Sequence, residues 1–429
     1  MAVLFYNFFL LLLKISIRIS SLFNPKAGKW LRGRENIFQR LEKAISKNAR
    51  LNDSFGQEKI IWMHCSSLGE FEQGRPVIEK LRTQYPGFKV LLTFFSPSGY
   101  EVKKDYAGAD WVFYLPIDGP RNAKKFLEIV NPSLVIFVKY EFWYYYLKKI
   151  KYRNIPLLLI SALFRKDMAF FKWYGGLQRK MLSRFDHLFV QNEESKQLMK
   201  KIGLENICTV SGDTRFDRVI EIAEKFEPIS AIEQFTGNNK VIVAGSTWKE
   251  DEKVLQKAFT DINNPALKLI IAPHEINEKH LEEVKNFFPG AMFLSELKNT
   301  NYKSPETGVL IVDSIGLLSR IFKYGHITYV GGGLRTMGVH NVLEAAVYGR
   351  PVLFGPYYSK YQEAVGLVES GGGISFKDAA ELKEKILFLL NDKQEYQKKC
   401  EASKQYVQNG KGSAEKIIRF IQEKRLLTS

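Results

Sequence analysis

Apolar and polar positions alternate along the chain in two successive series of the same kind. Short apolar runs of strand length alternate with amphipathic stretches of helical period, a pattern typical of parallel α/β domains. The predicted strands cover residues 60–65, 90–94, 134–138, 157–161, 187–191 and 208–210 in the first series, and 241–245, 267–272, 309–312, 327–330 and 351–354 in the second. Predicted helices between them include 71–85, 121–130, 341–348 and 361–369.

A charged, turn-rich stretch at about residues 219–239 separates the two series, and we interpret it as a linker. The chain has 429 residues, which is enough for two domains of roughly 150 to 200 residues each. We therefore predict an α/β fold with an N-terminal domain over residues 26–225 and a C-terminal domain over residues 226–429. The second domain ends in a polar, largely helical stretch over residues 381–427.

The N-terminal segment, residues 1–25, has a different pattern. Residues 3–13 are apolar apart from Asn7, and the apolar pattern then continues to Phe23 around Lys14 and Arg18. The uninterrupted run is shorter than the ~20 residues that span a bilayer. No positive charge precedes it and no small-residue cleavage site follows it, so it is a poor secretory signal. We expect a membrane anchor helix that dips into or marginally spans the bilayer, with a buried helix of the domain as the alternative.

The net charge of the chain limits the classes of molecule that it is expected to bind. A net charge of +17 favours nucleic acid, an anionic membrane surface or phosphorylated substrates. No Lys/Arg-dense tail and no nucleic-acid motif is present, so we favour the membrane and the phosphorylated substrate. The three cysteines are far apart and fit a reducing cytoplasm. Because the histidines lack metal-ligand spacing, the chemistry is predicted to need neither a metal nor another cofactor.

Candidate chemistry follows the strands of the first series, because ligands of parallel sheets bind at the carboxyl ends of the strands. Glu70 comes directly after the strand that ends at Cys65, and Gly69 permits a tight strand-to-helix turn. A carboxylate there can act as a general base for an attacking hydroxyl. Alternatively, it simply interacts with the positive end of the helix dipole.

Two further charged residues follow later strands. Glu141 is surrounded by aromatic residues, and it either pairs with Lys139 or Arg165 or orients a substrate. Arg215 follows the strand over 208–210 and can face a phosphate or carboxylate. A surface turn with an Asp–Arg pair is the alternative there.

The second series contains a glycine-rich loop at residues 331–333, followed by His340, Asn341 and a predicted helix. Glycines let the backbone approach a phosphate, and the N-terminus of the helix offers free N–H groups. Glu344 either hydrogen-bonds ribose hydroxyls or is an ordinary solvated glutamate. His274 either meets a phosphate or is structural, and residues 313–316 can offer backbone N–H groups to a nucleotide.

Together these motifs resemble the Kdo transferases (3-deoxy-D-manno-octulosonic acid transferases), a family with the GT-B architecture. The resemblance extends from the N-terminal apolar segment to about Phe376. Its landmarks are residues 32–34 (RGR), 67–70 (SLGE), 141–143 (EFW), 191–194 (QNEE), 215–217 (RFD) and 340–344 (HNVLE). Each motif is weak by itself, but their shared order and spacing are specific.

The resemblance implies two Rossmann-like α/β domains that face a cleft, with an N-terminal membrane-associated helix. It implies that Glu70 is the general base and that Glu141 and Arg215 support the transition state. The implied contacts to the CMP part of the donor are His274, Glu275, Ile315, Gly316, Leu317, Asn341, Val342, Leu343 and Glu344. The family has arginine where this chain has His274, so another base is expected to contact the donor phosphate. Arginine replaces the family's lysine at position 215, which keeps the charge.

The implied reaction is the inverting transfer of Kdo from CMP-Kdo to a lipid A precursor (lipid IVA) in lipopolysaccharide biosynthesis, at the cytoplasmic face of the bacterial inner membrane. Another GT-B enzyme, either a UDP-sugar transferase or a nucleotide-sugar epimerase, is one alternative. A non-catalytic membrane lipid-binding protein is a second. A dinucleotide oxidoreductase is disfavoured because no GxGxxG follows the first strand. The number of Kdo residues added stays open.

Overall fold

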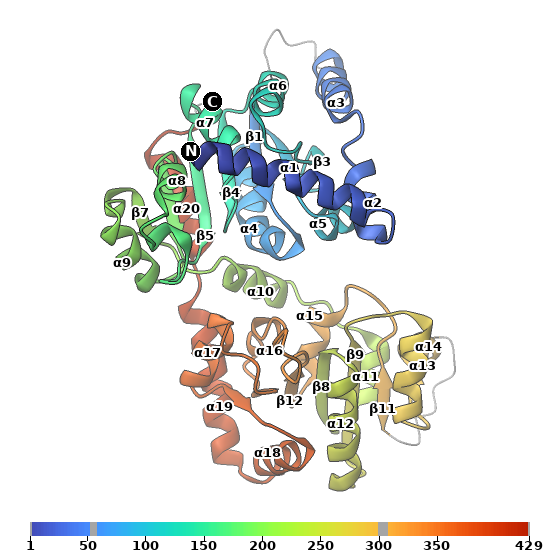
Figure 1. Ribbon diagram of the computed structural model, residues 1–429. Coiled ribbons are helices and arrows are strands. Elements are labelled where there is room, and N and C mark those ends of the chain that lie inside the picture. The colour runs from blue at the N-terminus through green and yellow to red at the C-terminus, as the bar shows by residue number, and fades with distance from the viewer. Residues whose placement is uncertain (1, 52–57, 299–307, 428–429) are drawn as a thin grey trace. The chain divides into compact units, whose positions relative to one another are not determined.

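The chain folds into two compact units in the computed structural model, which describes residues 2–51, 58–298 and 308–427 (Figure 1). The first unit runs to Arg218 and resumes at Gly412, and the second unit comprises Val219–Lys411. This division corrects the expected boundaries. The second unit begins at residue 219 rather than 226, and it ends before the last helix rather than at residue 429.

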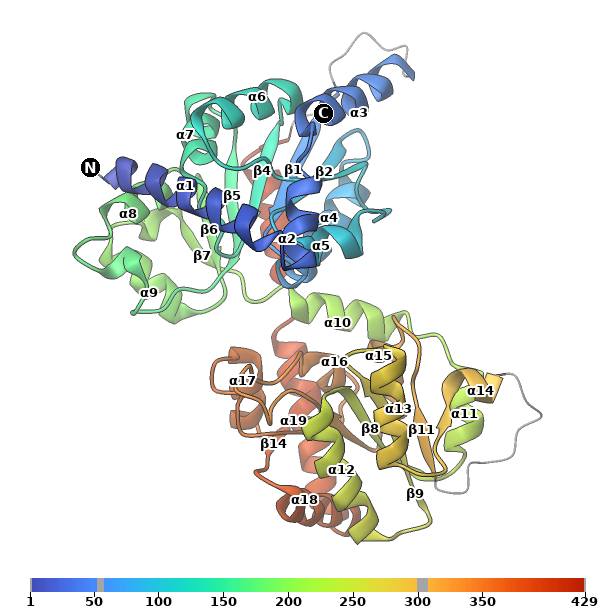
Figure 2. The same ribbon diagram turned by 45° about the vertical axis from the view of Figure 1, so that its right-hand side comes forward.

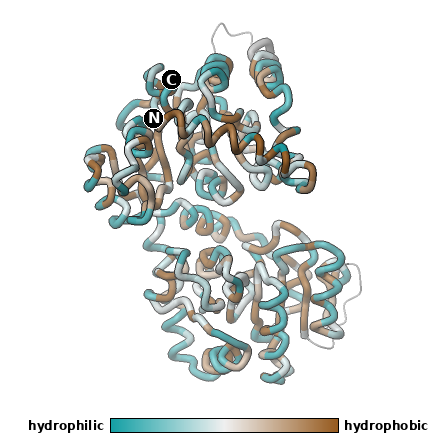
Figure 3. The backbone as a smooth tube through the Cα atoms, viewed as in Figure 1, coloured by the Kyte–Doolittle hydropathy of each residue, from teal (hydrophilic) through white to brown (hydrophobic). Residues whose placement is uncertain are grey.

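The first unit is built on a seven-stranded parallel sheet with the order β3-β2-β1-β4-β5-β6-β7. The strands are β1 (Ile60–Cys65), β2 (Lys89–Phe94), β3 (Trp111–Tyr114), β4 (Leu134–Val138), β5 (Leu157–Ala162), β6 (His187–Val190) and β7 (Cys208–Val210). All the strands predicted for this half are present, and only β3 was missed. Figure 3 shows the apolar runs of this sheet in its interior.

Helices cover both faces of this sheet (Figures 1 and 2). They are α1 (Ala2–Ser20), α2 (Pro25–Arg32), α3 (Ile37–Leu51), α4 (Leu68–Gln84), α5 (Pro97–Lys103), α6 (Pro120–Val130), α7 (Tyr144–Tyr152), α8 (Gly176–Leu182), α9 (Glu193–Lys201) and α20 (Ser413–Glu423). Successive residues of β1 pack on opposite faces: Trp62 joins the core under α3, α6 and α7, and Met63 joins the core under α4 and α20. This alternation is the two-residue period of a strand buried on both sides.

The last helix, α20, packs on the first unit because its apolar stripe matches the α4 face of that sheet. Ile417, Ile418 and Ile421 are fully buried in the core shared with α4. The Asp217 carboxylate also accepts hydrogen bonds from the backbone N–H groups of Gly412 (2.6 Å) and Ala414 (2.7 Å), where α20 begins. Asp217 of the RFD motif therefore stabilises the return of the chain to the first unit.

Helix α1 is the apolar helix expected at the N-terminus. It has the length and composition of a membrane-crossing helix, which by itself is weak evidence because a signal sequence or a buried core helix has the same properties. It is not a buried core helix, since Leu10 is its one buried residue and large apolar side chains such as Phe5 and Phe8 are more than half exposed. The Tyr6 hydroxyl donates to the buried Asp118 carboxylate (2.6 Å), which attaches α1 to the first unit.

The second unit repeats the architecture with a seven-stranded parallel sheet of order β10-β11-β9-β8-β12-β13-β14. Its strands are β8 (Lys240–Thr247), β9 (Leu267–Pro273), β10 (Met292–Phe293), β11 (Val309–Ile311), β12 (Ile327–Val330), β13 (Val352–Phe354) and β14 (Gly373–Ser375). The short edge strands β10 and β14 were not predicted. The order reverses between β8 and β12, which is the switch point where ligands of such sheets bind.

The helices of the second unit differ from the predictions in two places. They are α11 (Ser230–Thr236), α12 (Lys249–Ile262), α13 (Glu278–Phe287), α14 (Leu294–Lys298), α15 (Leu318–Ile321), α16 (Leu343–Ala346), α17 (Gln362–Glu369), α18 (Ala379–Asn391) and α19 (Lys393–Asn409), while α10 (Arg215–Glu224) crosses the boundary. The predicted linker over 219–239 is therefore largely helical, in α10 and α11. The helix expected over 341–348 is only the four-residue α16.

Candidate active site

Glu70 lies in the first turn of α4, directly after the carboxyl end of β1. Its Oε2 atom accepts hydrogen bonds from the backbone N–H of Ser67 (3.1 Å) and from the Ser67 hydroxyl. This contact is a capping box, which fixes the direction of the carboxylate. The expected tight turn at Gly69 is wrong, because Gly69 lies inside α4 and its φ is not positive.

Glu141 follows β4, the neighbour of β1 in the sheet, and is 6% exposed. The predicted pairing with Lys139 or Arg165 is not what holds it. Its Oε2 atom instead contacts His64 Nε2 (2.9 Å) and accepts a hydrogen bond from Trp143 Nε1 (2.6 Å). A buried carboxylate is costly unless such partners are present, so this pair explains how Glu141 is tolerated among aromatic rings.

Arg215 forms an ion pair with Asp213, two residues earlier in the chain. Its Nη2 lies 2.6 Å from Asp213 Oδ2, and its Nε also donates to this carboxylate (2.9 Å). Burial alone would raise the pKa of the Asp213 carboxyl. The Arg215 charge and hydrogen bonds, together with the charge of Lys139, hold that pKa below its usual value. The Asp–Arg pair considered from the sequence is therefore present, with Asp213 buried and Arg215 partly buried rather than on a surface turn.

These residues meet at the carboxyl edge of the first sheet. Burial raises the pKa of the Cys65 thiol, and the charges of Glu70 and Glu141 raise it further, so both carboxylates lie within electrostatic range of the end of β1. Gln73, one turn after Glu70 on α4, donates weakly to the Asp213 carboxylate (3.5 Å). The first unit thus brings its three predicted catalytic residues to one edge.

The glycine-rich loop after β12 in the second unit is packed against its own backbone. A Cβ on Gly331 would lie 2.3 Å from the Ser246 carbonyl oxygen, and one on Gly333 would lie 2.6 Å from the Gly355 backbone nitrogen. The Gly332 N–H donates to the buried Asp251 carboxylate (2.9 Å). These glycines therefore allow three segments to approach closely, which is a different role from the predicted phosphate cradle.

A stack of rings lies at the switch point of the second sheet, at the ends of β8, β9 and β12. His274 stacks on Trp248 (4.6 Å between ring centroids) and on His340 (4.3 Å), and Trp248 Nε1 donates to His340 Nε2 (2.9 Å). The surrounding protein partly removes both imidazoles from water and lowers their pKa values, that of His340 to about 4, although the His274 side chain is still exposed on one side. The Arg335 guanidinium covers the Trp248 ring at 4.2 Å. Both histidines are thus neutral at pH 7, and Arg335 is the fixed positive charge beside them.

The other predicted donor contacts divide into exposed and buried groups. Ile315 is 89% exposed, and Gly316 has a φ of +87° with open space around it. The side chains of Val342 and Leu343 are fully buried, so only their backbone atoms can meet a ligand. Asn341 Nδ2 donates to Glu344 Oε1 (3.1 Å) at the start of α16. Glu275, after β9, is exposed.

Sequence reasoning missed four residues that shape these edges: His64, Thr93, Trp248 and Arg335. His64 gave a usable signal, since it is a polar residue within an otherwise apolar run of central-strand length, and such a residue needs a buried partner. Arg335 gave none, because its position next to Trp248 depends on the fold of the loop after β12.

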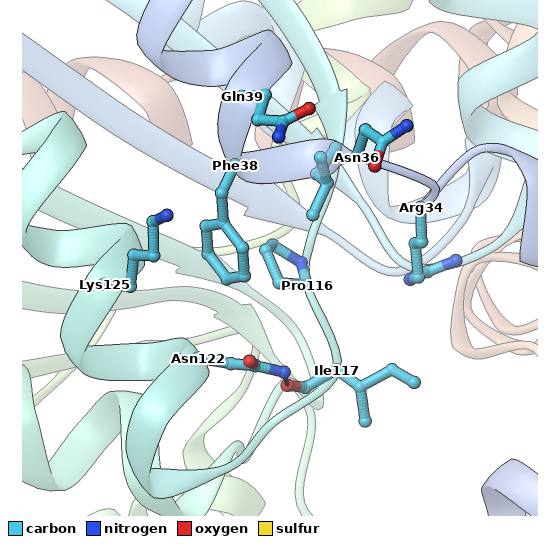
Figure 4. A pocket seen from close by; sticks show the side chains of 9 residues that line it. Arg34, Asn36, Phe38, Gln39, Pro116, Ile117, Asn122 and Lys125 are labelled. Carbon is cyan, nitrogen blue, oxygen red and sulfur yellow. Dashed lines mark hydrogen bonds between the residues drawn. The ribbon is translucent and has the colours of Figure 1, made fainter.

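A pocket of about 340 Å³ in the first unit is lined by none of the predicted site residues (Figure 4). Its lining comes from the segment before α3, from α3 itself, from the loop after β3 and from α6: Arg34, Asn36, Ile37, Phe38, Gln39, Pro116, Ile117, Asn122 and Lys125. Arg34 donates to the backbone carbonyls of Trp30, Phe95 and Leu115, which gives this residue of the RGR landmark a structural role.

Comparison with solved structures identifies the class. The chain matches the UDP-GlcNAc 2-epimerase of Neisseria meningitidis bound to UDP-GlcNAc with a TM-score of 0.60, over 85% of this chain and 100% of the epimerase, at 18% identity. An identity this low shows the fold alone. With two Rossmann-like α/β units and an apolar N-terminal helix, the protein has the GT-B fold.

Comparison of sequences identifies the family. Residues 35–218 match the family described as "3-Deoxy-D-manno-octulosonic-acid transferase (kdotransferase)". The 3-deoxy-D-manno-octulosonic acid transferase of Aquifex aeolicus is 31% identical over 342 residues, which cover 78% of this chain and 87% of the relative. That of Rickettsia felis is 26% identical over 84% of this chain and 78% of the relative. The chain belongs to the Kdo transferase family and is a glycosyltransferase.

Proposed function

We propose that this glycosyltransferase moves Kdo from CMP-Kdo to the lipid A precursor lipid IVA, with Glu70 as general base. The observation that supports this proposal most is the fixed carboxylate of Glu70 at the carboxyl end of β1, in a chain of the Kdo transferase family. Ser67 occupies Oε2 and thereby orients the carboxylate. A base must be held in this way to meet the proton that it abstracts.

In the proposed step, Glu70 accepts the proton of an acceptor hydroxyl while that oxygen attacks the anomeric carbon of Kdo. The bond from this carbon to the CMP phosphate oxygen breaks, and CMP leaves with the electron pair. A single displacement of this kind inverts the anomeric configuration. Glu141 would stabilise positive charge on the sugar ring, and Arg215 the negative charge on the leaving phosphate.

The second unit would bind CMP mainly through backbone N–H groups at the ends of β11 and β12. Ile315, Gly316 and Leu317 form one such segment, and Asn341, Val342, Leu343 and Glu344 form the other. We assign the donor phosphate to Arg335, because His274 and its neighbour His340 are neutral at pH 7 while the Arg335 guanidinium keeps its charge. Glu275 and Glu344 would then contact polar groups of the nucleoside.

Helix α1 would hold the enzyme at the cytoplasmic face of the bacterial inner membrane, where its acceptor is found. The exposed apolar side chains of α1 fit a lipid surface, and Lys14 and Arg18 on the same helix fit anionic headgroups. Replacing both Lys14 and Arg18 by glutamate should reduce co-sedimentation of the protein with anionic vesicles. Its binding to neutral vesicles should be affected less. Equal losses on both kinds of vesicle would contradict the role given to these charges.

The test is a transfer assay with purified full-length protein, CMP-Kdo generated in situ and lipid IVA, followed by mass spectrometry. Wild type should add one or more Kdo masses, and Glu70→Gln should reduce the rate by about 10²–10⁴. Glu72→Gln is the matched control, since Glu72 lies on the same helix and pairs with Lys103. If wild type releases no CMP but uses a UDP-sugar, the proposed donor is wrong. If Glu70→Gln behaves like Glu72→Gln, Glu70 is not the base.

A further inference from the structure

A line of hydrogen bonds runs through the interior of the first unit and ends on Glu141. Trp62 Nε1 donates to Thr93 Oγ1 (2.8 Å), and Thr93 Oγ1 lies 2.9 Å from His64 Nδ1. His64 Nε2 lies 2.9 Å from Glu141 Oε2, which also accepts from Trp143 Nε1 (2.6 Å). Trp62, Thr93 and His64 are fully buried on the central strands β1 and β2.

The chemistry of these groups gives the line a direction. An indole N–H can only donate, so Thr93 Oγ1 accepts from Trp62. The best acceptor within reach of the Thr93 hydroxyl proton is then His64 Nδ1, because the other one, the Met63 carbonyl, is 3.5 Å away. With Nδ1 as an acceptor, the neutral imidazole carries its proton on Nε2, which faces Glu141. Trp143 Nε1 lies 3.2 Å from His64 Nε2 but only 2.6 Å from Glu141 Oε2, so we assign its proton to the carboxylate.

We propose that His64, Thr93 and Trp62 are positioning residues that hold the Glu141 carboxylate in a fixed direction. Two N–H donors converge on Oε2, and a carboxyl proton on that oxygen would have to replace one of them. The contacts that Glu141 makes with the described residues all use Oε2, which leaves Oε1 for the substrate.

The effect of these residues on the reaction rests on the proposed function. If Glu141 stabilises positive charge on the transferring sugar, it must be ionised and correctly oriented before the sugar arrives. A free carboxylate in a cleft would meet that requirement through solvent, but Glu141 is buried. Strand β1 supplies one donor, His64, and the segment between β4 and α7 supplies the other, Trp143. The hydrogen bonds back to Trp62 fix which nitrogen of His64 holds the proton.

The decisive variant is Thr93→Val, which removes the hydroxyl and keeps the shape of the side chain. His64 Nδ1 can then only donate, to the Thr93 backbone carbonyl at 3.1 Å, so the proton leaves Nε2 or the ring becomes charged. We expect 15N NMR of the histidine side chains to show His64 as the Nε2–H tautomer in wild type and a changed form in Thr93→Val. The signal is assigned by its loss in His64→Gln.

The same variant should lower kcat by about 10- to 100-fold, the range of one hydrogen bond to a charged group. KM for the lipid acceptor should change little. Thr93→Ser returns the hydroxyl and should recover both the tautomer and most of the rate. Thr328→Val is the matched control, since Thr328 is also a buried strand threonine with a hydroxyl bonded to a backbone carbonyl, but it belongs to the second unit.

Three results would overturn the inference: a protonated imidazolium or Nδ1–H tautomer of His64 in wild type, an unchanged tautomer in Thr93→Val, or equal rates for Thr93→Val and Thr328→Val. If Thr93→Val unfolds, Trp143→Phe replaces it: removal of this second donor should lower kcat while His64 keeps its tautomer, and an unchanged kcat overturns the inference. If the wild-type protein transfers no Kdo, the NMR measurement still decides the hydrogen-bond direction, so the two failures are distinguishable.

Discussion

The carboxyl edges of the two sheets have the same topology but are built from different chemistry. In the first unit, charged side chains meet their partners inside the protein: Glu141 with His64, and Arg215 with Asp213. In the second unit, the corresponding edge also holds buried carboxylates, Asp251 and Glu252, but it adds tightly packed glycines, imidazoles that are neutral at pH 7 and an arginine that is about one-third exposed.

Under the proposed function, this difference corresponds to a division of work between the units. Buried ion pairs hold charges in fixed directions, which suits a reaction in which a proton moves and charge develops. Under the proposed function, the close-packed backbone of the second unit supplies a rigid shape for binding the nucleotide. The Rossmann-like architecture permits both, because it delivers loops to the carboxyl edge without fixing their composition.

The largest difference in stability between the two units is expected when one arginine of each is replaced by alanine. Arg215→Ala leaves the buried Asp213 carboxylate without its partner, which should lower the free energy of unfolding by about 3 kcal/mol. Arg335→Ala should cost less than about 1 kcal/mol, since its ion pair with Glu250 is long (3.9 Å) and exposed. Urea denaturation followed by tryptophan fluorescence measures mainly the free energy of unfolding of the first unit, because Trp248 is the one tryptophan of the second unit.

The same pair has a defined pH dependence. The pKa of Asp213 is lower in the folded protein than its unfolded value of about 3.9, so its ionisation stabilises the fold above that pH. This stability is lost as the pH falls through the lower, folded pKa. The difference between wild type and Arg215→Ala should therefore shrink in strong acid. A difference that stays constant from pH 7 to pH 3 would mean that the Asp213 charge is not its cause.

The next largest difference between the two carboxyl edges is expected in the stability changes caused by replacing a glycine with alanine. Gly333→Ala forces a Cβ against the Gly355 backbone and should destabilise the second unit by about 1–3 kcal/mol. Gly69→Ala has open space in the first turn of α4 and should stabilise the first unit by up to about 1 kcal/mol. Scanning calorimetry gives both values. If Gly333→Ala stabilises the second unit and Gly69→Ala destabilises the first, neither position has the packing described above.

A smaller effect is expected on nucleotide binding. Arg335→Ala should weaken the binding of CMP about tenfold, which corresponds to about 1.4 kcal/mol, because the phosphate loses its cation. Binding of cytidine, which has no phosphate, serves as the internal control and should be unchanged. Isothermal titration calorimetry with both ligands measures the difference. Equal losses for CMP and cytidine would assign Arg335 to the fold of the site rather than to the phosphate.

The smallest effect concerns the titration of His340. Its pKa of about 4 lies below the ordinary value of about 6.5, so the folded state favours the neutral ring and stability falls as the pH decreases between these values. Trp248→Phe keeps a ring in the stack but removes the N–H that donates to His340 Nε2. The pKa of His340, measured by NMR, should then rise. An unchanged pKa would leave burial, followed by the charges of His274 and Arg335, as the causes of the low value.

Much of the fold could be predicted because strands that are buried on both faces must be continuously apolar. The strands β1, β4, β8 and β12 lie within a residue or two of their predicted bounds for this reason. The edge strand β14 is three residues long and lacks this signal, whereas β3 is apolar along its length and was overlooked. The placement of Glu70, Glu141 and Arg215 at one edge also followed from the sequence, since each comes directly after a parallel strand.

Partners of the site residues could not be predicted in the same way. Lys139 and Arg165 are close to Glu141 in sequence, but His64 holds it, from a strand 77 residues earlier in the chain. Glycines gave an ambiguous signal for a related reason. Gly69 and Gly333 both precede or follow strands, yet only at Gly333 does another backbone segment come close enough to exclude a Cβ.

The sequence by itself determined the two α/β units, the apolar helix at the N-terminus and the strand ends at which chemistry can occur, because each depends on the local period of apolar residues. The tertiary structure alone decided that α20 returns to the first unit, that the imidazole stack is neutral, and that Glu141 is the end of a hydrogen-bonded line from Trp62. Those features depend on which side chains meet across neighbouring strands and helices. The local pattern of apolar residues along the chain does not specify that pairing.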